Sequence, residues 1–220
     1  MKRVKAGAMT EPENSPSTDL YERERQPLLM VISGSSGVGK DAVVQRMKEL
    51  GCPFSFVVTA TDRPPRPGEV HGQDYYFYST AEFERMIAEG EMLEHANVYG
   101  QHKGIPRAHV REALESGLDV MMRLDVQGAR TVKRLLPMAI TVFLLPESEE
   151  ELVARLHKRR TESEEALQRR LDTMRQELEH IQEFDYAVIN RHCALDRAVE
   201  DVRAILRAEH CRTRPRRVSL

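Results

Sequence analysis

The sequence lacks an excess of charge of either sign. Its 33 lysines and arginines are balanced by 35 aspartates and glutamates, so that the formal net charge of the 220 residues is −2. A chain with this balance has no overall attraction to nucleic acid or to an anionic membrane, and any anion has to be bound by a local group of residues. We therefore expect neither nucleic acid nor a membrane among its partners.

Long apolar runs and a disulfide framework are also lacking. No apolar stretch approaches the length that crosses a bilayer, and the N-terminal segment has no apolar centre of the kind found in secretory signals. The three cysteines are odd in number and widely spaced, at positions 52, 193 and 211, which favours free thiols in a reducing compartment. These absences predict an internal protein, and we expect it in the cytoplasm.

Both ends of the chain are expected to be poorly ordered. Residues 1–26 mix Pro, Ser, Glu, Arg and Lys without hydrophobic periodicity, so they cannot bury enough apolar surface to offset the entropy lost on ordering. Their acidic residues argue against a transit peptide, which is basic and poor in acids, and a plastid or mitochondrial location stays the alternative for a plant or algal protein. The basic segment 212–217 is predicted to fray, and residues 213–220 are predicted to form a basic tail after the domain.

Short apolar runs alternate with helical patterns through the rest of the chain. We expect strands at 28–32, 56–58, 120–124, 140–145 and 186–189, and helices at 40–50, 127–136, 148–159 and 195–209. An alternating series of strands and helices forms a mainly parallel sheet with helices on both faces. The sequence therefore predicts one α/β domain with insertions, which suits the length of the chain.

A glycine-rich loop lies between the first expected strand and the first expected helix. Its sequence, Gly34-Ser35-Ser36-Gly37-Val38-Gly39-Lys40, matches the phosphate-binding pattern G-x-x-x-x-G-K. The glycines let the backbone turn its N–H groups toward phosphate oxygens, and the lysine places a positive charge on the β- and γ-phosphates. The pattern predicts nucleotide binding, and an ordinary strand-to-helix turn is the alternative.

Asp41 follows this loop where the pattern usually has a serine or threonine that contacts Mg²⁺. A carboxylate is a stronger ligand for Mg²⁺ than a hydroxyl, but it also brings negative charge toward the triphosphate. We expect Mg²⁺ as a cofactor that accompanies the nucleotide, with Asp41 as its ligand.

A second anion site is indicated by the proline-rich segment 63–69. Its prolines exclude a helix and make the loop stiff. Arg63 and Arg66 are presented three residues apart, which suits bidentate binding of a phosphate, and the hydroxyl of Tyr75 offers a further donor. An exposed loop that binds nothing is the alternative.

Over residues 27–212 the order of these motifs resembles the guanylate kinase family. Further matching motifs are Asp74-Tyr75-Tyr76-Phe77, Gly90-Glu91-Met92-Leu93-Glu94, Val98-Tyr99-Gly100, Asp125-Val126-Gln127-Gly128, an Arg-rich stretch from Arg155 to Arg170, and Val188-Ile189-Asn190. The resemblance implies a P-loop nucleoside monophosphate kinase fold, with a core at 27–58 and 111–212, a GMP-binding subdomain at 59–110 and a lid at about 155–175. It also implies transfer of a phosphoryl group from ATP to GMP, and to dGMP.

The resemblance further implies roles for single residues on the GMP side. Arg63, Arg66 and Tyr75 match positions that hold the phosphate of GMP. Glu94 and Asp125 match positions that read guanine, which fits the chemistry because carboxylates accept hydrogen bonds from the N1–H and the exocyclic amine of that base.

On the ATP side the resemblance implies catalytic roles for Lys40 and for two lid residues, Arg159 and Arg170, which close over the phosphates. The other arginines of that stretch are expected to lie on a solvated helix face. Asn190 is expected to contact adenine.

Four positions depart from the common family pattern, and a fifth keeps its chemistry. Lys103 replaces a phosphate-binding tyrosine, Ile105 replaces a residue whose hydroxyl contacts the base, and Arg123 stands where many members have an acid. Together with Asp41 these changes resemble a variant branch found in plant organelles and some bacteria. Thr59 occupies a serine position and keeps the hydroxyl expected to contact GMP.

The two charge changes are expected to compensate. If Asp41 lies beside Arg123, the two side chains neutralise each other and the local charge balance is preserved. Two other functions stay open at this point, namely a non-catalytic guanylate-kinase-like binding module and a P-loop kinase for another phosphorylated acceptor. The oligomeric state is not predicted.

Overall fold

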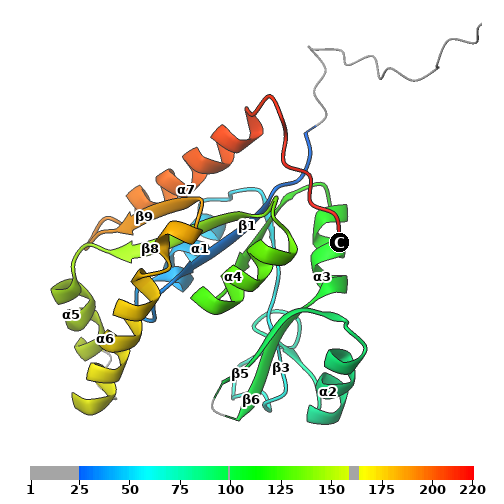
Figure 1. Ribbon diagram of the computed structural model, residues 1–220, viewed down its shortest axis with the longest axis horizontal. Coiled ribbons are helices and arrows are strands. Elements are labelled where there is room, and N and C mark those ends of the chain that lie inside the picture. The colour runs from blue at the N-terminus through cyan, green and yellow to red at the C-terminus, as the bar shows by residue number, and fades with distance from the viewer. Residues whose placement is uncertain (1–24, 99, 159–163) are drawn as a thin grey trace, which may run out of the picture.

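The computed structural model describes residues 25–98, 100–158 and 164–220, so most of the expected leader lies outside the described residues (Figure 1). The strands are β1 Leu29–Gly34, β2 Phe54–Phe56, β3 Ala60–Thr61, β4 Tyr76–Phe77, β5 Met92–Val98, β6 Gln101–Pro106, β7 Asp119–Arg123, β8 Ile140–Pro146 and β9 Tyr186–Asn190. The helices are α1 Lys40–Glu49, α2 Thr80–Ala88, α3 Arg107–Glu115, α4 Val126–Leu135, α5 Glu149–Lys158, α6 Glu164–Leu178 and α7 Leu195–His210, and a 3₁₀ turn covers Ile181–Glu183.

The larger sheet has five parallel strands in the order β2-β7-β1-β8-β9. Its central strand, β1, is buried along its whole length. Met30 and Ile32 pack with α1 and α7, whereas Leu29 and Val31 pack with α3 and α4, because successive side chains of a strand point to opposite faces. The expected α/β fold, with a parallel sheet covered by helices on both faces, is confirmed (Figure 1).

The segment between β2 and α3 forms a second sheet with the strand order β4-β3-β6-β5. Its long hairpin, β5 and β6, is antiparallel, and β3 pairs antiparallel with β6. Helix α2 covers this sheet by burying Phe83 and Met86 against Ala60 and Met92. This unit falls within 59–110, the segment expected to bind GMP, and that role stays a prediction.

Helices α5 and α6 form a hairpin beside the core (Figure 1). Leu152 and Leu156 of α5 pack against Leu171 and Met174 of α6 in a small apolar cluster of their own. Residues 159–163, which connect the two helices in the sequence, lie outside the described residues. Among the helices that the structure describes, none has both the length and the apolar character needed to cross a membrane.

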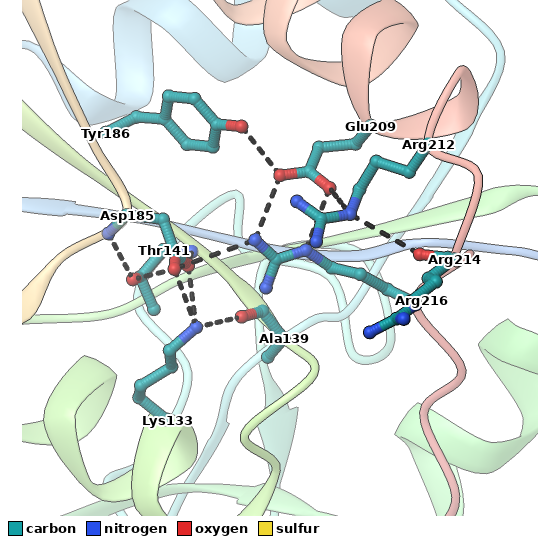
Figure 2. A network of polar contacts seen from close by, with 9 residues as sticks. All are labelled: Lys133, Ala139, Thr141, Asp185, Tyr186, Glu209, Arg212, Arg214 and Arg216. Atoms are coloured by element: carbon teal, nitrogen blue, oxygen red, sulfur yellow. Dashed lines mark hydrogen bonds and ion pairs between the residues drawn. The ribbon is translucent and has the colours of Figure 1, made fainter.

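The C-terminal tail is anchored to the core, so the prediction that it frays is wrong (Figure 2). Glu209, near the end of α7, is 1% exposed and accepts hydrogen bonds from Arg216 at 2.8 and 2.9 Å and from the Tyr186 hydroxyl at 2.6 Å. A buried carboxylate is unfavourable without a cation, and Arg216 supplies that cation from the tail. Val218 and Leu220 then pack against the core on the α3 and α4 side.

Candidate active site

The glycine-rich loop connects β1 directly to α1, as the pattern predicts. Gly37 and Gly39 have φ angles of 88° and 99°, in the left-handed region that side chains disfavour. A Cβ atom at Gly39 would lie 2.4 Å from Nδ2 of Asn190, and one at Gly37 would lie 2.7 Å from the side chain of Leu156. Glycine is therefore required by the backbone and also by the close approach of β9 and α5.

Lys40 begins α1, and its ammonium group points back into this loop. Nζ donates to the carbonyl oxygens of Gly34 and Ser35, the latter at 3.1 Å. Burial lowers the pKa of Lys40 from 10.5 to about 8, and the negative charges of Glu177 and Asp125 oppose this shift. Lys40 is therefore mainly protonated at neutral pH, and a cation lies where the motif predicts bound phosphate.

Asp41 and Arg123 lie side by side at the start of α1 and the end of β7. Arg123 forms an ion pair through Nη1 with Oδ1 of Asp41. The expectation that these two unusual residues lie together is confirmed. Burial lowers the pKa of Arg123, and an arginine stays charged even so.

The described residues contain no group of three or more His, Cys, Asp or Glu side chains that could hold a metal ion. Such a group is not needed for the Mg²⁺ that accompanies a nucleotide, because phosphate oxygens and water supply most of its ligands. The Asp41 side chain is 74% exposed, and its ion pair engages one carboxylate oxygen. The residues present therefore fit an ion held mainly by the nucleotide.

A cavity of about 220 Å³ lies between the loop lysine and the second sheet. It is lined by Lys40, Thr59, Tyr75, Glu94, Ala96, Lys103, Gly104, Arg123, Leu124 and Asp125. Five residues predicted for GMP thus share one cavity with the lysine predicted for ATP. The larger sheet contributes the end of β7, and the second sheet contributes β5 and β6.

Two carboxyl groups face the same small region of this cavity. A Cβ atom at Gly128 would lie 3.1 Å from the Glu94 carboxyl group and 3.2 Å from Oδ1 of Asp125. Glu94 is 9% exposed, and its burial, followed by the charge of Asp125, raises its pKa from 4.5 to about 7. Asp125 also caps α4, because its Oδ1 accepts a hydrogen bond from the Gly128 N–H at 2.7 Å.

Of the predicted phosphate arginines, Arg63 is buried and Arg66 is exposed. Arg63 is 7% exposed and donates to both carboxylate oxygens of Glu69, at 2.5 and 2.6 Å. These hydrogen bonds, with another from the backbone N–H of Arg66, lower the pKa of Glu69 to about 2. The Arg63 guanidinium also lies 4.9 Å from the centre of the Tyr75 ring, and Nζ of Lys103 lies 6.0 Å from it. Glu69 is a residue of this site that was not predicted, although its place in the 63–69 motif was a signal.

Similarity to known proteins identifies the family of this chain. The guanylate kinase family model matches residues 26–209. The chain belongs to the guanylate kinase family.

It is 47% identical to Guanylate kinase 2, chloroplastic/mitochondrial, of Oryza sativa subsp. japonica, over 89% of this chain and 69% of that protein. It is 43% identical to the guanylate kinase of Desulfitobacterium hafniense (strain Y51), over 85% of this chain and 92% of that protein. The crystal structure of guanylate kinase from Anaplasma phagocytophilum shares 29% identity at a TM-score of 0.68, covering 86% of this chain and 89% of that one. This member of the guanylate kinase family is accordingly a nucleoside monophosphate kinase, an ATP:GMP phosphotransferase, as the motif order predicts.

In this guanylate kinase family member Arg155 lies against the glycine loop, so its assignment to a solvated helix face is wrong. Its guanidinium donates to the carbonyl oxygens of Val38 at 3.2 Å and Asn190 at 2.9 Å. Nδ2 of Asn190 donates to the same Val38 carbonyl at 2.8 Å. The charge pattern of α5 gave no sign of this, because the contacts join residues far apart in the sequence.

The remaining predicted residues are placed less completely. Asn190 is 5% exposed and its amide is engaged with the loop, and its contact with adenine stays a prediction. Arg170 lies partly buried on α6. Arg159 lies outside the described residues, and the lid role of both arginines stays a prediction. Ile105 is fully buried in the core and pairs across the sheet with Glu94.

Proposed function

We propose that the chain converts GMP and ATP to GDP and ADP, and accepts dGMP as well, in the cavity that holds Lys40, Glu94 and Asp125. The observation that carries this proposal is the pair of carboxyl groups beside the loop lysine. Guanine presents N1–H and an amine as donors, whereas N1 of adenine is an acceptor, so two carboxylates select guanine.

On the donor side, the loop 34–40 binds the ATP phosphates through backbone N–H groups, and the N-terminus of α1 adds a favourable dipole. Lys40 neutralises charge on the β- and γ-phosphates. Asp41 would hold Mg²⁺ directly or through water, and the ion, when bound, would supply further positive charge. The Arg123 partner keeps the negative charge of Asp41 from repelling the triphosphate.

On the acceptor side, Glu94 and Asp125 accept hydrogen bonds from guanine, and Glu94 loses its proton when the base binds. Arg63 and Lys103, whose charged groups both lie near the Tyr75 ring, hold the GMP phosphate. Arg66 and the hydroxyls of Thr59 and Tyr75 complete the site. In this proposal a phosphate oxygen of GMP faces the γ-phosphate of ATP. Phosphoryl transfer requires mainly such positioning and charge stabilisation.

The lid completes the reaction in this proposal. Arg159 and Arg170 close over the transferring group, stabilise its charge and exclude water, so that the phosphoryl group reaches GMP rather than solvent. We place the activity in the cytoplasm. A plastid or mitochondrial location is the alternative, since one relative is named chloroplastic/mitochondrial.

A coupled assay of ADP release tests the proposal with GMP, dGMP, AMP, CMP, UMP and a sugar phosphate as acceptors. Rapid turnover is expected with GMP and dGMP and little with the others. Equal turnover with AMP contradicts the base-reading role of Glu94 and Asp125. Preference for a non-nucleotide acceptor favours another phosphorylated substrate, and absence of turnover with retained GMP binding favours a binding module.

A further inference from the structure

Asp62 and His102 form a buried hydrogen-bonded pair that the site described above does not use. Oδ1 of Asp62 accepts from the backbone N–H of His102 at 2.7 Å, and Oδ2 contacts Nδ1 of the ring, also at 2.7 Å. The side chains are 6% and 20% exposed. An ionised carboxylate only accepts hydrogen bonds, so Nδ1 carries the proton.

This pair lies where β3 and β6 stop pairing. The ladder between them ends at Thr61 and Lys103. Beyond that rung the chain enters the 63–69 loop, whose two successive prolines have no N–H to continue a ladder. The carboxylate of Asp62 replaces the missing rung, while the Asp62 N–H and the Thr61 hydroxyl both donate to the His102 carbonyl, at 3.3 and 2.9 Å.

The ring of His102 is fixed from its face as well as its edge. Phe83 of α2 is fully buried and stacks on it, with ring centres 5.4 Å apart and an angle of 19° between the planes. Burial by itself raises the pKa of Asp62, but the hydrogen bonds from His102 outweigh it and the pKa lies below its usual value. The pair is therefore a rigid link between two strands, hydrogen-bonded through both the backbone and the side chain of His102.

The residues that follow the pair are the two cations at Tyr75. Arg63 directly follows Asp62, and Lys103 directly follows His102. Their charged groups lie 4.9 and 6.0 Å from the centre of the Tyr75 ring. The Asp62–His102 pair thus lies one residue before each cation, where it can fix the backbone positions of both.

We propose that Asp62 and His102 are a positioning pair, which holds Arg63 and Lys103 at the separation that lets both cations bind the phosphate of one GMP molecule. This inference rests on the proposed acceptor site. It assigns the two side chains a role in GMP affinity and none in ATP binding. Preorganised cations bind an anion more tightly because their ordering entropy is lost on folding rather than on binding.

The test measures the dissociation constants of GMP and of ATP by calorimetry on the full chain, together with kcat and KM for each substrate. These values are compared between the wild type and the variants. Asp62→Ala and His102→Phe are expected to raise the Kd and the KM for GMP about tenfold, with the Kd for ATP unchanged. Asp62→Asn retains an acceptor for the His102 N–H, and His102→Asn retains a donor near Nδ1. These conservative variants are expected to stay within about threefold of the wild type.

A matched control lies in the larger sheet, at the end of β7 that is away from the cavity. Asp119, at the start of β7, pairs with His210 at 2.9 Å, with side chains 5% and 20% exposed. His210→Phe removes the same kind of contact far from the cavity, so it is expected to lower the unfolding midpoint without changing the Kd for GMP. If Asp62→Ala does not fold, His102→Phe decides, because it keeps the ring on Phe83.

The outcomes separate this inference from the proposed function. Wild-type protein that does not bind GMP contradicts the proposed function itself. The positioning role is overturned if the wild-type protein binds GMP and His102→Phe leaves the GMP affinity within twofold, while lowering the unfolding midpoint as His210→Phe does. A GMP-specific loss that the conservative variants restore supports it.

Discussion

Arg123, the last residue of β7, forms an ion pair with Asp41 in the first turn of α1. Strand β7 lies next to β1, so the end of β7 and the residue after the glycine loop meet at the same edge of the sheet. Arg123 therefore brings a positive charge to the negative charge that Asp41 places beside the phosphate site. We expect the two departures from the common family pattern to act as one exchange.

The exchange predicts a specific order of damage. Arg123→Ala leaves an uncompensated acid beside the triphosphate, whereas Asp41→Ser combined with Arg123→Asp restores the common pattern. The single variant is therefore expected to lose more kcat/KM for ATP than the double variant. The measurement is a double-mutant cycle on kcat/KM for ATP across a Mg²⁺ titration. Strictly additive effects of the substitutions at the two positions argue against coupling.

Glu94 predicts a pH dependence of GMP binding. Guanine needs the ionised carboxylate, and in the free protein burial raises the pKa of Glu94 to about 7. The Kd for GMP is therefore expected to rise about tenfold from pH 8 to pH 6. GMP has its own phosphate ionisation, so Glu94→Gln serves as the reference over the same range. Parallel pH profiles for wild type and variant contradict the role of Glu94, as does a variant that loses ATP affinity alone.

The burial of Glu94 is also expected to lower the stability of the ligand-free protein. Glu94 ionises more easily in the unfolded chain, near its ordinary pKa of 4.5, than in the folded protein, where the pKa is about 7. The free energy of unfolding therefore decreases as pH rises through this interval. Glu94→Gln is expected to stabilise the ligand-free protein by on the order of 2 kcal/mol at pH 8 and not at pH 4, measured by urea unfolding. Glu84 is exposed, so Glu84→Gln is the control. An equal gain in stability for Glu84→Gln means that burial of Glu94 is not the cause.

Local sequence was sufficient to predict the strand, loop and helix that carry the glycine-rich motif. The glycine loop, the strand before it and the helix after it are adjacent in the chain, so their pattern predicts their geometry directly. Asp41 and Arg123 were paired because they depart from the family pattern with opposite changes of charge, and the structure confirms the contact. The order of the strands and helices followed from apolar periodicity, because a buried parallel strand and an amphipathic helix have distinct patterns.

Contacts between distant segments could not be predicted in this way. Arg155 and Arg216 both looked like solvated charges, yet each donates hydrogen bonds to groups fixed by tertiary packing, the Val38 carbonyl and the Glu209 carboxylate. A charged residue has the same local pattern whether its partner is water or a buried acceptor. The Asp62 and His102 pair was missed for the same reason.

The lid prediction concerns the transferring phosphoryl group. Arg159→Ala or Arg170→Ala is expected to lower kcat by on the order of a hundredfold, because charge stabilisation in the transition state is lost. Arg160→Ala is the control and is expected to do little. The measurement is kcat with both substrates saturating. Small and similar effects at all three positions indicate a solvated face instead.

Arg155 offers a last prediction, about how the glycine loop is held. Its guanidinium and the amide of Asn190 converge on the Val38 carbonyl, directly beside Gly39, whose left-handed conformation shapes the phosphate site. Arg155→Ala removes one of these two donors and its bond to the Asn190 carbonyl, so the loop has more conformations to lose when ATP binds.

The expected result for Arg155→Ala is a Kd for ATP about tenfold weaker, with the Kd for GMP unchanged, measured by calorimetry. Arg175→Ala is a matched control on the same helical hairpin, since Arg175 of α6 pairs with Glu149 of α5 and its side chain is 53% exposed. Such a surface pair contributes less than about 1 kcal/mol to stability and lies outside the cavity. Equal ATP affinities for the two variants mean that Arg155 acts only as a surface charge, whereas a loss confined to Arg155→Ala identifies it as a support of the phosphate loop.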